Sequence, residues 1–322
     1  MQKKEPLISI ITINYNQLEV SCEMLDSVKE LSYPNLEIIF VDNASKNSPR
    51  QHINKHYPEV HFIRSEKNLG FSGGNNLGIK ASSGDFLFFV NNDTVLADGL
   101  LESLIEVFDK IPQLGIVSPL IRYFPSEETA GKNIIQYAGT TEVNPYTARN
   151  TTLGVGEEDK GQYSQAHPTP YAHGAAMMLP RTVVEQVGGM PEEFFLYYEE
   201  LDWCEQIRKA GYKVYIEPKA KIFHKESLSV GKSSTLKTYY LTRNRIFFMR
   251  RNRSPFQVFL FSCFLLIFTI PKNVLLYLMK GEGQHLKAFL RGIWWNISRQ
   301  DRLLPASYKA VNTFLYPSKS KA

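Results

Sequence analysis

Two stretches of this sequence carry carboxylates in settings that could support chemistry. The first runs from Asn91 to Thr94, reads Asn-Asn-Asp-Thr, and directly follows the apolar run Phe86–Val90. A buried strand that ends in this way places Asp93 at a sheet edge, where a carboxylate can hold a divalent cation and, through it, a phosphate. On the tetrapeptide alone, a turn followed by a helix cap is the commoner explanation, because these residue types favour both.

The second stretch runs from Phe194 to Asp202 and sets aromatic rings directly beside the carboxylates of Glu199, Glu200 and Asp202. Acidic residues are common in the first turn of a helix, where its dipole favours them, but a helix start does not explain the aromatic run. Flat rings can stack on the apolar face of a sugar while carboxylates bind its hydroxyls, and one carboxylate can take a hydroxyl proton. The stretch therefore predicts a sugar site with a general base.

Strands and helices alternate through the first third of the chain. Four apolar runs read as strands, and the segments between them show helical spacing or are short enough for a single crossover. This alternation favours an α/β fold with a parallel sheet and right-handed crossovers. The predicted strands are Leu7–Ile13, Leu36–Val41, Val60–Arg64 and Phe86–Val90.

Three of these strands end in polar residues, which we expect to meet at one edge of the sheet. They are followed by Asn14 to Asn16, by Asp42-Asn43 and by the stretch that contains Asp93. A connector rich in glycine, residues 68–78, lies between the last two exits, and its backbone could approach a ligand closely. An ordinary strand-to-helix turn would explain the glycines as well. No Gly-x-Gly-x-x-Gly follows the first strand and no P-loop motif is present, which counts against both dinucleotide and P-loop enzymes.

In sequence order, these motifs resemble the signature of family 2 glycosyltransferases, and in particular of the rhamnosyltransferase-like branch. The resemblance covers about residues 7–250 and rests on the exits at Asn14, Asp42 and Asn91 and on the connector Asn68-Leu69-Gly70-Phe71-Ser72-Gly73-Gly74-Asn75. It implies a glycosyltransferase A fold, which is Rossmann-like with a mostly parallel sheet. It also implies a nucleotide-sugar donor, a Mg²⁺ or Mn²⁺ ion and inversion at the anomeric carbon.

The resemblance assigns roles to individual residues. Asp93 stands at the last position of the Asp-x-Asp motif of the family and would bind the metal, although the first acid is Asn91 here. Asp42 would contact the nucleoside. Glu199-Glu200 resembles the Glu-Asp-x-Asp element, so Glu200 is the first candidate for the base and Glu199 the second. The expected donor-binding residues are Asn14, Tyr15, Asp42, Asn43, Asn68, Gly74, Asn75 and Asn92.

The acceptor side is expected around His173 and the helix that follows Glu199. A lone histidine such as His224 is more often structural, but the family places a histidine here against the metal and the diphosphate. A histidine ligand would shift the preference of the site toward Mn²⁺. The Gln-x-x-Arg-Trp motif of processive synthases is missing, which indicates that one sugar is added per acceptor. The expected acceptor-binding residues are His173, Gly174, Tyr198, Asp202 and Trp203.

Charge is distributed unevenly along the 322 residues, whose net charge is +5. Residues 221–322 hold 18 basic and three acidic residues, so this end suits an anionic surface. The apolar run Phe256–Ile270 is shorter than the roughly 20 residues of a spanning helix, and Pro271-Lys272 follows it. We expect an interfacial or re-entrant anchor on an anionic membrane, with a buried hairpin as the alternative. Nucleic acid is disfavoured because the basic residues flank apolar runs.

The sequence thus predicts a catalytic domain at 1–250, with a nucleotide-sugar half at 7–118 and an acceptor half at 119–250, and a helical membrane-associating tail at 251–322. Three scattered cysteines form no disulfide pattern, and the N-terminal apolar run lacks a cleavage site. Both observations favour the cytoplasmic side of the plasma membrane.

The leading hypothesis is a metal-dependent, inverting, non-processive glycosyltransferase of bacterial cell-surface polysaccharide synthesis. It would move a sugar from a nucleotide-sugar, with dTDP-rhamnose as the first candidate and UDP- and GDP-sugars open, to a saccharide acceptor linked to a lipid. A nucleotidyltransferase would need a second metal-binding acid and a basic nucleotide-gripping motif early in the chain, and neither is present. A catalytically silent carbohydrate-binding protein is the remaining alternative.

Overall fold

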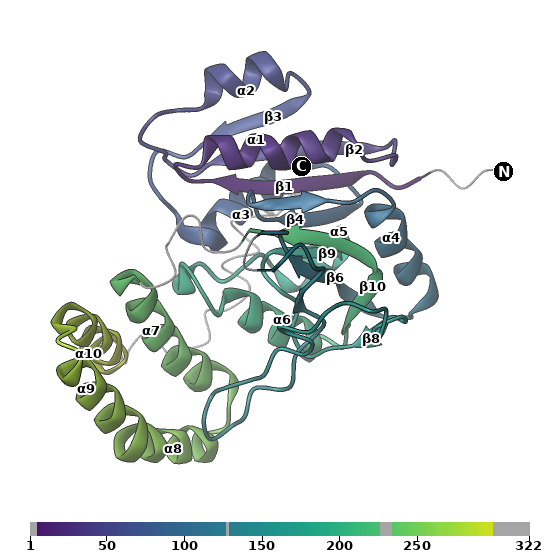
Figure 1. The fold of residues 1–322 in the computed structure, drawn as a ribbon. Coiled ribbons are helices and arrows are strands. Elements are labelled where there is room, and N and C mark those ends of the chain that lie inside the picture. The colour runs from purple at the N-terminus through teal and green to yellow at the C-terminus, as the bar shows by residue number, and fades with distance from the viewer. Residues whose placement is uncertain (1–4, 127–128, 226–233, 299–322) are drawn as a thin grey trace, which may run out of the picture.

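The computed structural model describes residues 5–126, 129–225 and 234–298, and a single sheet organises the larger part of them (Figure 1). The sheet has ten strands, and eight of them follow the order β3-β2-β1-β4-β9-β6-β10-β5, with β7 paired to β6 and β8 to β10. The strands are β1 (Ile8–Asn14), β2 (Leu36–Asp42), β3 (Val60–Arg64), β4 (Phe86–Val90), β5 (Thr94–Leu96), β6 (Leu114–Tyr123), β7 (Ile135–Tyr137), β8 (His167–Pro168), β9 (Ala176–Pro180) and β10 (Lys213–His224).

The sheet is parallel from β3 to β4 and mixed beyond that point. β9 runs antiparallel to both β4 and β6, whereas β6 and β10 are parallel to each other. The predicted parallel strands are therefore present, but the sheet as a whole is mixed. The antiparallel entry of β9 pairs Ala176 with Val90, which brings the segment before β9 beside the polar exit of β4.

Helices cover both faces of the sheet, because strand residues alternate between two apolar clusters. Ile10 of β1 points into a cluster with α1, α2 and α4, and its neighbour Ile11 points into a second cluster with α3, α5, α6 and α7. The helices are α1 (Leu18–Lys29), α2 (Arg50–His56), α3 (Gly70–Ala81), α4 (Leu100–Lys110), α5 (Arg181–Val187), α6 (Glu199–Lys209), α7 (Thr235–Asn252), α8 (Pro255–Phe264), α9 (Ile270–Met279) and α10 (Gly283–Ser298), with the short turns η1 (Glu192–Phe194) and η2 (Leu265–Thr269).

The glycines of the connector serve helix packing. Gly74 and Gly78 lie within α3, and a Cβ atom on them would come within 2.8 Å of Ile13 and 2.3 Å of Ile11. Their missing side chains let α3 lie directly on β1. This corrects the expectation that this part of the connector brings its backbone to a ligand.

The C-terminal helices form an arm beside the sheet, in which α10 packs along α7 (Figure 1). Helices α8 and α9 join through the π-helical turn η2 into one helix, Pro255–Met279, which by length and composition is long and apolar enough to cross a membrane. The predicted interruption at Pro271 is therefore wrong, because the wider turn before it accommodates the missing amide N–H. Helix α10 is described to Ser298, and residues 299–322 of the predicted tail lie outside the described residues.

Candidate active site

One cavity of about 390 Å³ lies at the polar exits of β1, β2 and β4, between them and the start of α6. This volume lies in the range of ligand pockets. The cavity brings together Asp93, His173, His224, Glu199 and Glu200, which come from four separate segments. Its other lining residues are Ile13, Tyr15, Asn43, Asn68, Gly70, Phe71, Asn91, Asn92, Gln136, Gly174, Ala175, Phe195, Leu196, Tyr197, Leu236 and Lys237.

Asp93 and His224 face each other across the pairing of β5 with β10. The His224 Nε2 and Asp93 Oδ1 atoms are 3.1 Å apart, and both side chains are buried. The other ring nitrogen, Nδ1, lies 2.8 Å from Oε1 of Gln136. An amide oxygen can only accept, so Nδ1 carries the hydrogen, and the lone pair of Nε2 is left facing the carboxylate.

This arrangement fits a divalent cation. Asp93 Oδ1 is buried and makes no hydrogen bond with the described residues, and it faces the lone pair of His224 Nε2 at 3.1 Å, so two electron-pair donors converge on one point. A metal-binding histidine commonly donates its other N–H to an oxygen acceptor, as His224 does to Gln136. One oxygen and one imidazole ligand suit Mn²⁺ better than Mg²⁺. No group of three His, Cys, Asp or Glu side chains with metal spacing occurs in the described ranges, so further ligands would have to come from a bound donor and water.

Glu199 and Glu200 open helix α6 and share one buried environment. Each carries a buried Oε2 atom that lacks a hydrogen-bond partner within the described parts of the chain. Burial raises the pKa of Glu200 to about 7 and raises the pKa of Glu199 well above its usual range, where the charge of Glu200 raises it further. Backbone N–H groups at the helix start lower both pKa values, but the burial effect is larger. The higher pKa of Glu199 favours its neutral form and leaves Glu200 as the better candidate for the ionised member of the pair.

His173 is a neutral ring beside the metal candidates. Its Nδ1 atom accepts the backbone N–H of Ala175 at 3.1 Å, and its ring meets that of His224 edge-on with centroids 6.0 Å apart. Burial, and after it the neighbouring His224 ring, lowers the pKa of His173 to about 3. His173 can therefore offer a neutral N–H through Nε2 but carries no charge near neutral pH.

The expected donor residues separate into two groups. Tyr15, Asn43, Asn68 and Asn92 line the cavity, whereas Asn14, Asp42, Gly74 and Asn75 lie behind its wall. Asp42 is fully buried; Arg64 donates to its Oδ2 atom at 2.6 Å and Asn14 to its Oδ1 atom at 3.1 Å. Asp42 therefore does not line the cavity directly, and its expected contact with the nucleoside stays a prediction.

Gly74 and Asn75 face away from the cavity within α3. Gly74 packs against Ile13, and the amide of Asn75 donates to the carbonyl of Phe71, one turn earlier in the helix, at 3.1 Å. Both residues are buried. Their expected contact with the donor is corrected to a structural role in seating α3 on the sheet.

The expected acceptor residues also separate. His173 and Gly174 line the cavity, but Tyr198 packs on Phe248 and Trp203 is completely buried, with its Nε1 donating to the carbonyl of Gly188. The expected acceptor contacts of Tyr198 and Trp203 are therefore corrected. Trp203 lies one helical turn after Glu199 and packs into the core instead.

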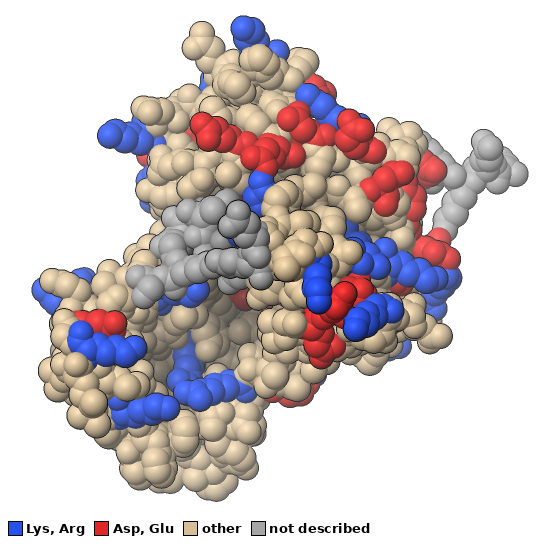
Figure 2. Space-filling view, in the orientation of Figure 1, with Lys and Arg blue, Asp and Glu red and all other residues tan. Residues whose placement is uncertain are grey.

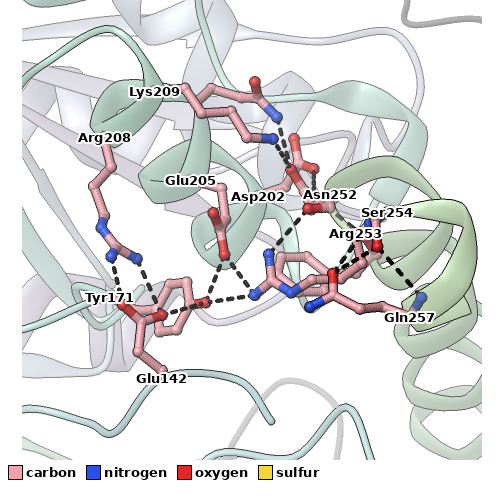
Figure 3. A network of polar contacts seen from close by, with 12 residues as sticks. Glu142, Tyr171, Asp202, Glu205, Arg208, Lys209, Asn252, Arg253, Ser254 and Gln257 are labelled. Carbon is pink, nitrogen blue, oxygen red and sulfur yellow. Dashed lines mark hydrogen bonds and ion pairs between the residues drawn. The ribbon is translucent and has the colours of Figure 1, made fainter. Parts of the chain in front are cut away.

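Asp202 lies in a separate polar network that joins α6 to the end of α7 (Figure 3). Asn252 donates to its Oδ1 atom at 2.5 Å, and Arg251 pairs with it at 3.0 Å. Nearby, Arg253 donates to both Glu205 and Tyr171. Asp202 thus fixes α6 against α7, which corrects the expectation that it binds the acceptor.

Several lining residues were not predicted. Gln136 comes from the aperiodic region at 122–170, where the sequence offered no signal, and Lys237 comes from the start of α7. Phe195 and Tyr197 belonged to the predicted aromatic run, but their place depends on positive φ angles of 64° and 69°, which the sequence does not reveal. Gly70, with φ at 72°, lies so close to the Phe195 carbonyl that a Cβ atom would be 2.2 Å from its oxygen.

Residues 9–188 match the family described as "Glycosyl transferase family 2". The match covers more than half of the chain, and the protein belongs to this family. This confirms the family and the glycosyltransferase class expected from the motifs.

Two relatives share between 23% and 28% of their residues with this chain over the aligned regions. The chain is 28% identical over 211 residues to the low-salt glycan biosynthesis hexosyltransferase Agl10 of Haloferax volcanii. This alignment covers 64% of this chain and 63% of that protein. It is 23% identical over 242 residues to the N-acetylglucosaminyl-diphospho-decaprenol L-rhamnosyltransferase of Mycobacterium tuberculosis. This second alignment covers 70% of this chain and 78% of that protein. The chain thus spans less than two thirds of the first relative.

Two solved structures share the fold. One is GalNAc-T7 with UDP, GalNAc and Mn²⁺, with a TM-score of 0.57 and 18% identity over 73% of this chain and 47% of that one. The other is the mannosyltransferase PcManGT of Pyrobaculum calidifontis with GDP-Man and Mn²⁺, with a TM-score of 0.55 and 15% identity over 97% of this chain and 85% of that one. The predicted glycosyltransferase A fold is confirmed.

Proposed function

We propose that this protein transfers one sugar residue from a nucleotide-sugar to a hydroxyl of a saccharide acceptor, with inversion at the anomeric carbon. The observation that carries this proposal is a single cavity that holds the Asp93–His224 pair and the Glu200 carboxyl together. The Asp93–His224 pair could bind the diphosphate of a donor through a metal ion. The Glu200 carboxyl could take the proton of an acceptor hydroxyl, and a direct displacement needs both groups.

On the donor side, Asp93 and His224 would hold Mn²⁺ or Mg²⁺. When bound, such an ion supplies stabilisation of the negative charge that develops on the leaving nucleoside diphosphate. Tyr15, Asn43 and Asn68 lie in the same cavity and would surround the nucleotide. The two similar structures hold Mn²⁺ together with UDP or GDP-Man, which supports a nucleotide-sugar and a divalent ion here.

On the acceptor side, Glu200 would act as the general base. The acceptor oxygen forms a bond to the anomeric carbon while the bond from that carbon to the diphosphate breaks, and the hydroxyl proton passes to the Glu200 carboxylate. Glu199 remains protonated and can donate a hydrogen bond. A single displacement of this kind inverts the anomeric centre and leaves no covalent sugar on the enzyme.

The transfer rate should rise with pH through neutrality. Glu200 has a pKa raised to about 7, and only its deprotonated form can accept the proton, so kcat should fall about tenfold for each pH unit below that value. The measurement is kcat between pH 5.5 and 8.5 at saturating donor and Mn²⁺. A rate that stays constant down to pH 5.5 would contradict a base with a raised pKa.

The donor is proposed to be dTDP-rhamnose, and the acceptor a saccharide linked to a lipid diphosphate, in cell-surface polysaccharide synthesis. The support is the name of the mycobacterial relative, which describes a rhamnosyltransferase acting on a decaprenol diphosphate sugar. The test is a screen of dTDP-, UDP- and GDP-sugars with Mn²⁺ and lipid-linked acceptors, read as nucleotide release and acceptor mass. Absence of turnover with every donor, despite donor binding, would favour a silent carbohydrate-binding protein.

The C-terminal arm is proposed to seat the enzyme on the cytoplasmic face of the plasma membrane, as a peripheral or re-entrant anchor. Basic patches lie over the tail helices in Figure 2, and residues 235–298 hold ten Lys and Arg against one acid, Glu282. Only 17% of the most apolar window in Pro255–Met279 is buried. The exposed apolar side chains of the arm include Phe256, Phe259, Leu266, Ile267, Phe268, Leu275, Leu278, Met279, Leu290, Trp294 and Ile297.

The triple variant Phe259→Ser, Ile267→Ser, Leu278→Ser should bind vesicles at least about 100-fold more weakly. Each side chain is more than half exposed, and burial of such a group in lipid contributes about 1.5–3 kcal/mol. The measurement is co-sedimentation with phosphatidylcholine vesicles containing phosphatidylglycerol. The control is Leu153→Ser, Val155→Ser, which removes exposed apolar groups from the catalytic half. Equal partitioning of both variants would overturn the membrane seat.

A further inference from the structure

The loop Phe195–Tyr198 joins η1 to the catalytic end of α6 and holds an unusual backbone. Phe195, Tyr197 and Tyr198 have φ angles of 64°, 69° and 74°, a region that bulky side chains avoid. Three of the four loop residues line the cavity, and the next two residues are Glu199 and Glu200. Such a backbone persists only where its surroundings hold it, so the structure must contain groups that do so.

Two buried side chains of α7 provide this hold. The Asn244 amide nitrogen donates to the carbonyl oxygens of Phe194, Leu196 and Tyr197 at 2.9, 2.8 and 2.8 Å. Its two hydrogens are thus shared among three acceptors. The Arg243 Nη2 atom donates to the carbonyl oxygen of Phe194 at 2.7 Å and to that of Glu193 at 2.5 Å.

The pair is itself held in one orientation. The Arg243 Nε atom donates to Asn244 Oδ1 at 2.7 Å, which fixes the amide so that its nitrogen faces the loop. The guanidinium also lies over the rings of Tyr240 and Trp295, at 4.8 and 4.6 Å from their centroids. Asn244 is completely buried and Arg243 nearly so. Burial of so many polar groups would be unfavourable without the loop carbonyls that they satisfy.

We propose that Arg243 and Asn244 are positioning residues of the transfer reaction, which hold the loop 194–198 and thereby aim the Glu200 carboxyl into the cavity. They act through the loop backbone and touch no reacting atom. The inference rests on the proposed function, since it assigns the pair to the base of that reaction. A carboxyl displaced by about 1 Å can lose on the order of 100-fold in rate.

The test compares Asn244→Ala and Asn244→Asp with the control Asn296→Ala. Asn296 is also a buried amide between α7 and α10, but it donates to the carbonyls of Arg243 and Gly292 and not to the loop. We expect both Asn244 variants to lose about 100-fold in kcat, with the donor KM changed by less than about threefold, because Asp93 and His224 are untouched. We expect the control to keep its kcat.

The pH profile gives a readout that a purely structural role would not move. Glu200 is faced by Glu199 on its own helix, by Cys204 one turn later and by Tyr198 at the helix start. A released loop would admit water to Glu200, so the midpoint of the kcat–pH profile should move to lower pH by about one unit in Asn244→Ala. Arg243→Lys keeps the charge and should show a smaller change in the same direction.

Hydrogen exchange of residues 193–200 tests the hold without turnover. We expect this segment to exchange faster in Asn244→Ala than in Asn296→Ala at matched global stability. If the segment exchanges faster in Asn244→Ala but the wild type transfers no sugar, the proposed function is wrong, while the role of Asn244 in fixing the loop is retained. Equal exchange, equal kcat and an unmoved pH midpoint in the Asn244 and Asn296 variants would overturn the inference. If both Asn244 variants fail to fold, Arg243→Lys decides by the same three measurements.

Discussion

Replacement of Asp93 by Asn should lower kcat for sugar transfer by about 1,000-fold while the protein stays folded. The change keeps the size of the side chain but removes the anionic ligand, and loss of one charged ligand to the ion corresponds to about 4 kcal/mol of transition-state stabilisation. Asn91 and Asn92 are amides and cannot replace the carboxylate. The measurement is nucleotide release under saturating donor, with Mn²⁺ titrated up to millimolar concentrations.

The matched control for this experiment is Asp98→Asn. Asp98 is an exposed carboxylate that accepts hydrogen bonds from Ser32 and does not line the cavity. Its replacement should leave kcat and the Mn²⁺ dependence unchanged. Full activity of Asp93→Asn at the wild-type Mn²⁺ concentration would remove the metal role from Asp93.

Replacement of Glu200 by Gln should lower kcat by about 1,000-fold, whereas Glu199→Gln should lower it by only about tenfold. The difference follows from the proposed roles: Glu200 must ionise to accept the proton, whereas the raised pKa of Glu199 favours its neutral form, which Gln resembles. The donor KM should stay near the wild-type value in both variants. The measurement is steady-state transfer at pH 8 with both substrates varied. The reverse order of the two losses would move the base to Glu199.

The sequence predicts well which strands and strand ends form the site, because these features depend on local patterns of apolar and polar residues. Buried strands that end in polar residues predicted that Asn43, Asn92 and Asp93 would gather at one sheet edge, and the structure brings all three to the cavity. The apolar runs also predicted the parallel part of the sheet. These features follow from periodicity and chain direction, which a single sequence contains.

Other features depend on tertiary contacts and could not be read in this way. Asp42 follows a strand just as Asp93 does, but Arg64 of the neighbouring strand binds its carboxylate. Trp203 adjoins the acidic run, yet its helical position turns it into the core against Phe89. The hydrogen bonds from Asn244 to the loop join residues about 50 positions apart in the sequence. They also depend on positive φ angles in the loop, which a sequence pattern does not predict.

Titration of Mn²⁺ with a nucleoside diphosphate tests the central claim most directly, because it separates the ion site from the base. Binding would be followed by the electron paramagnetic resonance signal of free Mn²⁺ in the wild type, Asp93→Asn and Glu200→Gln. We predict that Glu200→Gln binds the ion and nucleotide as tightly as the wild type although its kcat is about 1,000-fold lower. We also predict that Asp93→Asn binds the ion at least about tenfold more weakly. Wild-type ion affinity in Asp93→Asn, or loss of ion binding in Glu200→Gln, would contradict the division of one cavity into a metal side and a base side.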